Sequence, residues 1–114
     1  MTESHSPPVY IRLRDMIAAA ILDGTYQEGE FLPSVRAFAA EQGANPLTVA
    51  KAYQQFRDDG LIAVQRGVGM YIVAGAAEKL RCHERQQFLD QEWPRIRKKI
   101  SRLGINFSEL TENT

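Results

Sequence analysis

The sequence of 114 residues contains a single cysteine, Cys82, so the chain cannot form an internal disulfide. A lone cysteine is typical of proteins in a reducing compartment, and we expect a cytoplasmic protein. No apolar run approaches the roughly 20 residues needed to cross a membrane, so we expect no membrane partner. The polar opening MTESHSPP also lacks the charged-then-apolar layout of a secretory signal.

Sequence motifs of enzymes are missing as well. The chain has no phosphate-binding loop, no nucleophile elbow and no paired carboxylates in an apolar setting, so we predict neither an enzyme nor a cofactor. A redox or metal switch at Cys82 and His83 is a weaker alternative. The chain has no second cysteine and no other histidine except His5, so a metal site there would need ligands from both subunits. We therefore predict no metal site.

The net charge is zero, but the charges are unevenly distributed. Residues 7–74 contain six Lys/Arg and seven Asp/Glu, whereas residues 75–104 contain eight Lys/Arg and four Asp/Glu. DNA-binding domains usually carry a clear basic excess. Any DNA binding by the first part of the chain must therefore depend on a few well-placed cations.

Apolar residues make up 44% of the chain, which is enough for a hydrophobic core. Apolar side chains at helical spacing predict helices within residues 9–24, 34–42 and 46–59, with a loop at residues 25–33. The side chains expected to face the core are, on the first helix, Tyr10, Leu13, Ile17, Ala20 and Ile21 and, on the third helix, Val49, Ala52, Tyr53 and Phe56. Ser34 and Asn45 are favourable N-caps, and Gly43 ends the second helix. Only a short turn separates the second and third helices, as in a helix-turn-helix.

The β-branched segments 61–65 and 70–74 bracket the sequence RGVG and predict a β-hairpin. The fold class is therefore mainly α with a small β-hairpin: a winged helix-turn-helix domain at residues 8–75 and a helical dimerisation tail at residues 76–114. We expect Pro94 to make the tail helix kink or restart, and Asn106 and Glu109 to form a capping box. Apolar residues of the tail alternate in steps of four and three, which predicts a dimer interface formed by Leu89, Trp93, Ile96, Ile100 and Leu103.

Candidate DNA-binding residues follow from the helix-turn-helix geometry. In such domains the N-terminal part of the second helix enters the major groove, and its outward face here carries Leu47, Thr48 and Lys51. Helix N-termini also bind phosphates. The phosphate-contacting candidates are Ser34, Arg36, Asn45, Arg66, Gly67 and Gly69. Each has an ordinary explanation alone, as a cap, a turn or a solvated charge, so the ordered assembly carries the prediction.

With this assembly, residues 8–74 resemble the winged helix-turn-helix domain of the GntR family of bacterial transcriptional regulators. The resemblance is carried by Tyr10, Ile21-Leu22-Asp23-Gly24, Leu32-Pro33-Ser34 with Arg36, and Asp59-Gly60-Leu61-Ile62 followed by Gly67-x-Gly69. The segment NPLTVAKAY and the short tail resemble the YtrA-like subfamily. The resemblance implies a homodimer on a pseudo-palindromic operator, with DNA contact at Arg36 and, more loosely, at Ser34, Thr48 and the wing glycines.

The chain departs from the family pattern at several positions. Many members carry arginines where this sequence has Pro46 and Ala50, and Lys51 follows one residue later. Val68 and Met70 occupy wing positions that are commonly basic or threonine. These departures imply a weaker electrostatic contribution to DNA binding. The cations between Arg95 and Arg102 could supplement it, but we favour a solvated face beside the dimer interface.

We therefore predict a sequence-specific DNA-binding transcriptional regulator, a repressor, whose homodimer binds double-stranded operator DNA through helix 46–59 and wing 66–70. The alternative is a winged-helix module for protein–protein contact without specific DNA binding, and the acidic balance of residues 7–74 favours it. The sequence names no operator and no small-molecule effector.

Overall fold

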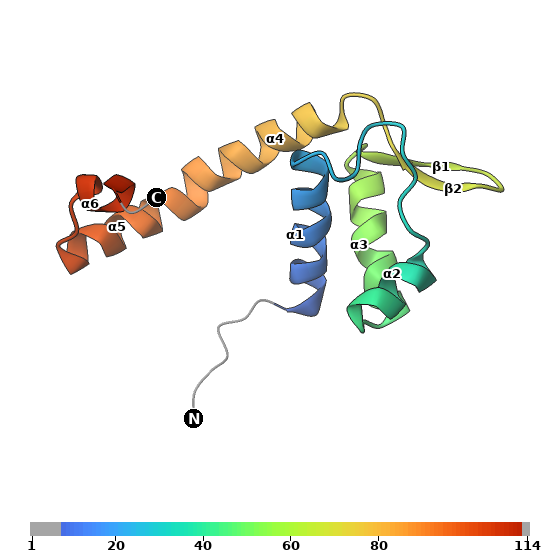
Figure 1. Ribbon diagram of the computed structural model, residues 1–114, viewed down its shortest axis with the longest axis horizontal. Coiled ribbons are helices and arrows are strands. Elements are labelled where there is room, and N and C mark those ends of the chain that lie inside the picture. Colours follow the sequence, from blue (N-terminus) through green and yellow to red (C-terminus); the bar gives the residue numbers. More distant parts are fainter. Residues whose placement is uncertain (1–7, 113–114) are drawn as a thin grey trace. The chain divides into compact units, whose positions relative to one another are not determined.

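The computed structural model describes residues 8–112 (Figure 1). Residues 1–7, which include most of the polar opening, and residues 113–114 at the end of the predicted tail lie outside the described part. The chain divides into two compact units, Met1–Arg81 and Cys82–Thr114, which are described separately below. The boundary falls within helix α4 (Ala76–Gln87).

The first unit has the element order of a winged helix-turn-helix. It consists of α1 (Val9–Leu22), α2 (Val35–Gln42), α3 (Pro46–Asp58), β1 (Ile62–Gln65), β2 (Gly69–Ile72) and the start of α4. The predicted fold class, mainly α with a small β-hairpin, is thus confirmed. The second strand begins at Gly69, one residue before the predicted segment, because Gly69 pairs with Gln65.

Both helices of the helix-turn-helix begin at an N-cap, and a glycine ends the first of them. The Ser34 hydroxyl oxygen accepts a hydrogen bond from the Ala37 N–H (3.1 Å), and the Asn45 side-chain oxygen accepts one from the Leu47 N–H (2.8 Å). Gly43 ends α2 with a φ of 63°, a left-handed conformation that favours glycine. The predicted caps and turn are therefore present in the structure.

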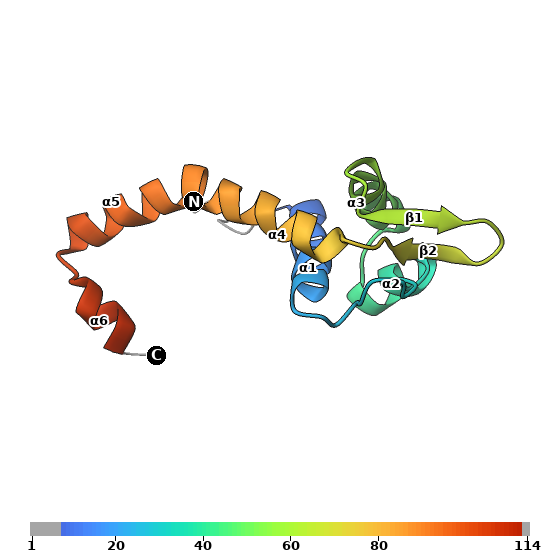
Figure 2. The same cartoon turned by 90° about the horizontal axis from the view of Figure 1, so that it is seen from above.

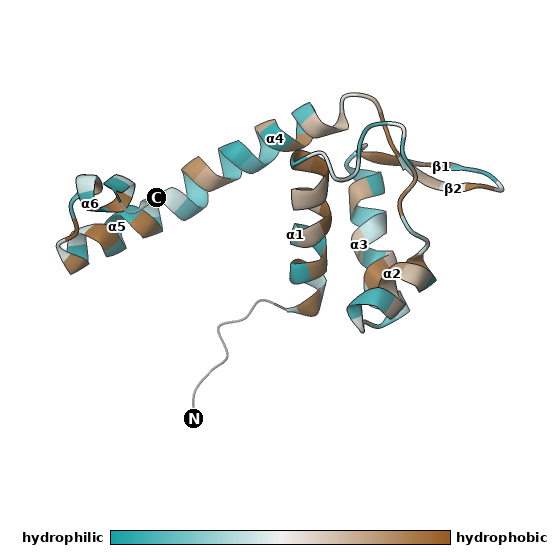
Figure 3. Ribbon diagram, viewed as in Figure 1, coloured by the Kyte–Doolittle hydropathy of each residue, from teal (hydrophilic) through white to brown (hydrophobic). Residues whose placement is uncertain are grey.

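The core of the first unit lies between α1 and α3, which run side by side in the same direction (Figure 1). Figure 3 shows the apolar side of α1 turned toward α3. The predicted stripe on α3 is buried, and it consists of Val49, Ala52, Tyr53 and Phe56. Each such large apolar side chain contributes about 1.5–3 kcal/mol by leaving water.

On α1 the buried face differs slightly from the predicted one. Leu13, Ile17 and Ile21 are buried as expected, but Ala18 is buried while Ala20 and Tyr10 are only partly buried. Alanine is apolar but small, so a run of three alanines does not show by itself which one faces the core.

The wing is a β-hairpin with an added edge. Ile62 lies opposite Ile72 in an antiparallel register, and Figure 2 shows the two strands from above. The loop between α1 and α2 pairs with the outer side of β2. The Gly29 N–H donates to the Ile72 carbonyl (2.7 Å), and the Leu32 N–H donates to the Met70 carbonyl (2.8 Å). The loop before α2 is therefore attached to the wing.

Tyr53 connects α3 to the start of α2. Its hydroxyl donates a hydrogen bond to the Pro33 carbonyl (2.7 Å), and its ring lies 6.0 Å from the Phe38 ring. Burial, with smaller contributions from the charges of Tyr26 and Glu41, raises the pKa of the Tyr53 hydroxyl above its ordinary value. A buried phenol whose proton is donated to a carbonyl is strongly favoured in its neutral form.

The second unit is entirely helical over its described residues. After α4 come a π-helical segment, η1 (Phe88–Glu92), and then α5 (Trp93–Leu103) and α6 (Phe107–Glu112). The predicted interruption is confirmed, since a new helix begins with Pro94 in its first turn. The Asn106 N–H donates to the Glu109 carboxylate (2.8 Å), which completes the predicted capping box.

Replacing Tyr53 by phenylalanine tests the link between α3 and α2. Tyr53→Phe keeps the ring but removes the hydrogen bond, and we expect a loss of about 1 kcal/mol in the free energy of unfolding, measured by urea denaturation. Because the pKa is raised in the folded state, the unfolded chain releases this proton first above about pH 10. Wild-type stability should fall there more steeply than that of the variant. Equal alkaline slopes would contradict this account of Tyr53.

Candidate nucleic-acid interface

The two N-caps of the helix-turn-helix each retain a hydrogen-bond donor. Ser34 uses its oxygen to accept from the Ala37 N–H, and its hydroxyl proton is still available for donation. Asn45 caps α3 with its carbonyl oxygen, and its amino group is a second, separate donor. Capping and phosphate binding are thus compatible at both residues, and neither function excludes the other.

The outward face of α3 is divided into two parts. At its N-terminal end Leu47 is 79% exposed, Lys51 is exposed and Thr48 is partly buried. Further along the helix, the Gln54 amide donates to the Asp58 carboxylate (2.8 Å). This hydrogen bond pairs two exposed polar side chains of the C-terminal part of the face with each other.

Lys51 has a partner that sequence reasoning did not identify. Its ammonium nitrogen lies 4.8 Å from the centroid of the Tyr10 ring, on helix α1. The sequence pattern predicts Tyr10 only as a core-facing residue and as part of the family resemblance. A contact between residues so distant in sequence depends on the packing of α1 against α3, and no local pattern indicates it.

The wing and α2 provide two more exposed cations, Arg36 and Arg66. Neither takes part in an ion pair within the part of the chain that the structure describes. Gly67 adopts a φ of 81° in the turn, where a side chain would introduce strain. At the tip, Val68 is 61% exposed. The wing thus presents one cation beside a narrow glycine turn.

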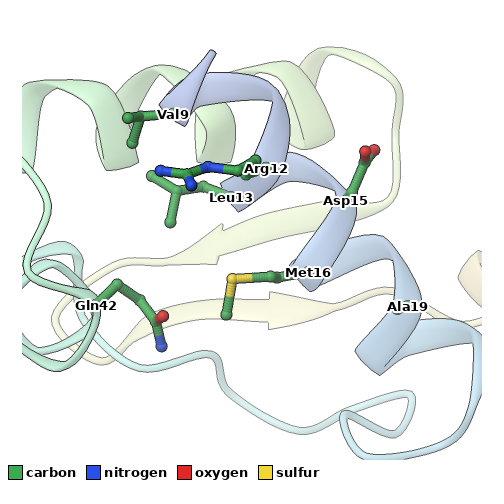
Figure 4. Close-up of a pocket in the computed structure, with 7 residues that line it drawn as sticks. All are labelled: Val9, Arg12, Leu13, Asp15, Met16, Ala19 and Gln42. Carbon is green, nitrogen blue, oxygen red and sulfur yellow. The ribbon is translucent and has the colours of Figure 1, made fainter. Parts of the chain in front are cut away.

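A hollow of about 610 Å³ lies between α1 and the C-terminal end of α2 (Figure 4). Its described lining residues are Val9, Arg12, Leu13, Asp15, Met16, Ala19 and Gln42. All but Gln42 come from α1, and the surface of a single helix is convex. Among the described residues, the hollow therefore lacks the surrounding walls of an enclosed effector pocket.

The second unit presents apolar side chains without enclosing them. None of its described residues, 82–112, is buried. Within the predicted dimer interface, Leu89 is 41% exposed, Ile96 40% and Leu103 60%, while Trp93 and Ile100 are partly buried. The Trp93 ring packs between Phe88 (6.5 Å) and Phe107 (6.1 Å). The cations from Arg95 to Arg102 are exposed on the same helix.

Residues 8–112 contain neither a membrane-spanning helix nor a cluster of metal ligands. No helix in this range is long and apolar enough to span a bilayer. The same range contains no group of three or more His, Cys, Asp or Glu arranged to hold a metal ion. Cys82 and His83 are both exposed.

Residues 9–72 match the family described as "Bacterial regulatory proteins, gntR family", and this match covers more than half of the chain. The chain belongs to the GntR family. The family resemblance drawn from the sequence is thereby confirmed, and members of this family are regulators of transcription rather than enzymes.

Known relatives agree with this assignment. The HTH-type transcriptional repressor YtrA of Bacillus subtilis is 39% identical over 75 residues, a match that covers 66% of this chain and 58% of YtrA. A GntR family transcriptional regulator from Listeria monocytogenes has a similar structure, with a TM-score of 0.75, 28% identity and coverage of 96% and 95% of the two chains. YtrA from Sulfolobus acidocaldarius gives a TM-score of 0.58 at 32% identity, covering 76% and 90%.

Proposed function

We propose that this GntR protein is a sequence-specific DNA-binding repressor, which binds a pseudo-palindromic operator as a homodimer in the cytoplasm. The observation that carries the proposal is the exposed N-terminal half of α3, set within a winged helix-turn-helix of the GntR family. The repressor role is supported by YtrA of Bacillus subtilis, which is named a transcriptional repressor. In this proposal residues 8–75 form the DNA-binding domain and residues 76–114 the dimerisation tail.

Three side chains of α3 are proposed to read base edges in the major groove. Leu47, which is 79% exposed, provides an apolar contact for a thymine methyl group. The Thr48 hydroxyl can donate or accept a hydrogen bond, and the Lys51 ammonium suits guanine O6 and N7. These contacts are few, so the remaining affinity must come from the DNA backbone.

Phosphate contacts are assigned to the helix N-termini and the wing. Ser34 and Asn45 each offer a side-chain donor where the positive end of a helix dipole favours an anion. Arg36 lies beside the first of these sites, and Arg66 with Gly67 and Gly69 allows the wing to approach the backbone closely. Backbone dipoles thus supplement the attraction of phosphates by the few cations of a domain in which Lys and Arg do not outnumber Asp and Glu.

A second copy of the chain is the proposed cover for the apolar face of the tail. A helical unit without a single buried residue over 82–112 gains little stability alone. Each leucine or isoleucine fully removed from water at an interface contributes about 1.5–3 kcal/mol. Two-fold symmetry would then place two recognition helices on half-sites about one DNA turn apart, or a multiple of it.

The acidic balance of the first unit favours one other candidate, a winged helix that binds protein rather than DNA. The salt dependence of DNA binding separates the two candidates, because only a DNA-binding domain releases counterions from phosphates.

Salt titration with a duplex obtained by in vitro selection tests the regulator directly. If Arg36 and Arg66 each neutralise one phosphate in both subunits, the logarithm of the association constant should fall with a slope of about −4 against the logarithm of salt concentration. Lys51→Ala should cost roughly 1–3 kcal/mol and relax sequence preference, if Lys51 reads a base. Arg57→Ala, at the other end of α3, is the control.

An equal loss on all duplexes would assign Lys51 to a phosphate instead. Absence of binding to any DNA at low salt would contradict the regulator and favour the protein-binding module.

Substitutions of Asn45 separate capping from DNA contact. Asn45→Ala should lower the free energy of unfolding by about 1 kcal/mol, because the Leu47 N–H loses its acceptor. Asn45→Asp keeps the cap and should preserve thermal stability, but its carboxylate replaces an amino donor and repels phosphate. We expect the aspartate variant to bind the selected duplex most weakly in an anisotropy titration. Wild-type affinity in this stable variant would make Asn45 a cap alone.

A charge placed in the proposed dimer interface should separate the subunits. Ile100→Asp puts a carboxylate where the second copy would bury an apolar side chain, and we expect monomers by analytical ultracentrifugation. Ile96→Asp should behave in the same way. Lys98→Asp introduces the same carboxylate on the opposite side of α5 and should leave the dimer intact. A stable dimer of both isoleucine variants would refute the role of the tail.

A further inference from the structure

We propose that Tyr10 is a positioning residue for Lys51, whose ammonium it holds against its ring before DNA binds. This inference rests on the proposed function, since it concerns how one base-reading side chain of α3 is oriented. It adds α1, a helix usually regarded as scaffold, to the elements that set sequence preference.

The geometry joins an anchored ring to a mobile cation. The distance of 4.8 Å from the Lys51 nitrogen to the Tyr10 ring centroid lies within the range of about 6 Å in which ammonium groups are attracted to aromatic faces. Tyr10 is partly buried and packs against the core of the first unit, whereas Lys51 is exposed. The ring is therefore the fixed partner in this pair, and the lysine side chain is the one whose freedom is reduced.

The placement puts the pair beside the proposed reading surface. α1 and α3 run in the same direction, so their N-terminal ends lie at the same end of the first unit (Figure 1). Tyr10 lies in the first turn of α1, and Lys51 follows Leu47 by one helical turn on α3. Arg14, one turn further along α1, lies over the Phe56 ring of α3 at 5.7 Å. Two aromatic–cation contacts in register thus connect α1 with α3.

Restraint of Lys51 has a consequence for recognition. A lysine side chain has a long, flexible stem, and it loses conformational freedom when it binds one base. If the Tyr10 ring already restricts this stem in the free protein, part of the conformational entropy is lost on folding, and less of it is lost when DNA binds. The ammonium has three N–H donors, so the contact with one ring face leaves donors for guanine O6 and N7. We therefore expect Tyr10 to increase both affinity and discrimination between base pairs.

The test is a double-mutant cycle on the full-length protein, with the duplex selected by the wild type. Tyr10→Leu removes the aromatic face and keeps an apolar side chain, while Tyr10→Phe keeps the ring and serves as the matched control. We expect Tyr10→Leu to bind about twofold to fivefold more weakly and to discriminate less between single-base variants. Tyr10→Phe should bind like the wild type. In the Lys51→Ala background, Tyr10→Leu should have no further effect.

A second readout is independent of DNA. In NMR spectra of the free protein, ring currents of Tyr10 should shift the Lys51 side-chain methylene signals upfield. The shift should persist in Tyr10→Phe and disappear in Tyr10→Leu. Thermal unfolding of each variant shows whether it is folded at the temperature of the titrations.

The possible failures are distinguishable. Wild-type affinity in Tyr10→Leu, or an equal loss with and without Lys51, would overturn the positioning role and leave the regulator proposal standing. If the wild type selects no duplex at all, the regulator proposal itself fails, and the role of Tyr10 in DNA reading fails with it.

Discussion

The hydrogen bond from Tyr53 to the Pro33 carbonyl is the contact on which the arrangement of the proposed DNA-binding elements depends. Tyr53 belongs to the buried face of α3, and Pro33 immediately precedes the cap of α2. The segment that leads into Pro33 is itself paired with β2 of the wing. One buried side chain thus connects α3, the N-terminus of α2 and, through the loop, the hairpin. In the proposed complex these elements reach one groove and its neighbouring phosphates together.

The charge distribution explains why such connections matter. A strongly basic domain can bind DNA in many orientations, whereas the first part of this chain contains slightly more acidic than basic residues. Its proposed contacts use a few cations, two helix N-termini and a glycine turn, and each of these is effective only at short range. DNA affinity that another domain would gain from an excess of cations must therefore come here from the correct relative placement of these few groups. In the proposed homodimer, a second subunit doubles the number of DNA contacts without changing the composition of either subunit. Pairing of two copies through the exposed apolar face of the tail would therefore raise DNA affinity.

Local patterns in the sequence predicted the elements, and the exposure of Leu47 and Lys51 on α3, better than the contacts between elements. Ser34, Gly43 and Asn45 determine helix ends by local chemistry, so the helix-turn-helix was predictable, as were the restart at Pro94 and the capping box at Asn106. Three features were not: the pairing of the loop before α2 with the wing, the Tyr53 hydrogen bond, and the contact of Tyr10 with Lys51. All three join segments distant in sequence, and their geometry is set by tertiary packing. The burial of Ala18 rather than Ala20 has the same origin.

Hydroxyl-radical footprinting on a duplex selected by the wild-type protein tests the central claim most directly. A homodimer with one recognition helix per half-site should protect two clusters of backbone positions related by two-fold symmetry. Their centres should lie about 10 base pairs apart, or a multiple of that spacing. Protection of a single unsymmetrical cluster would contradict the dimeric arrangement. A uniform cleavage pattern at low salt would contradict sequence-specific DNA binding altogether.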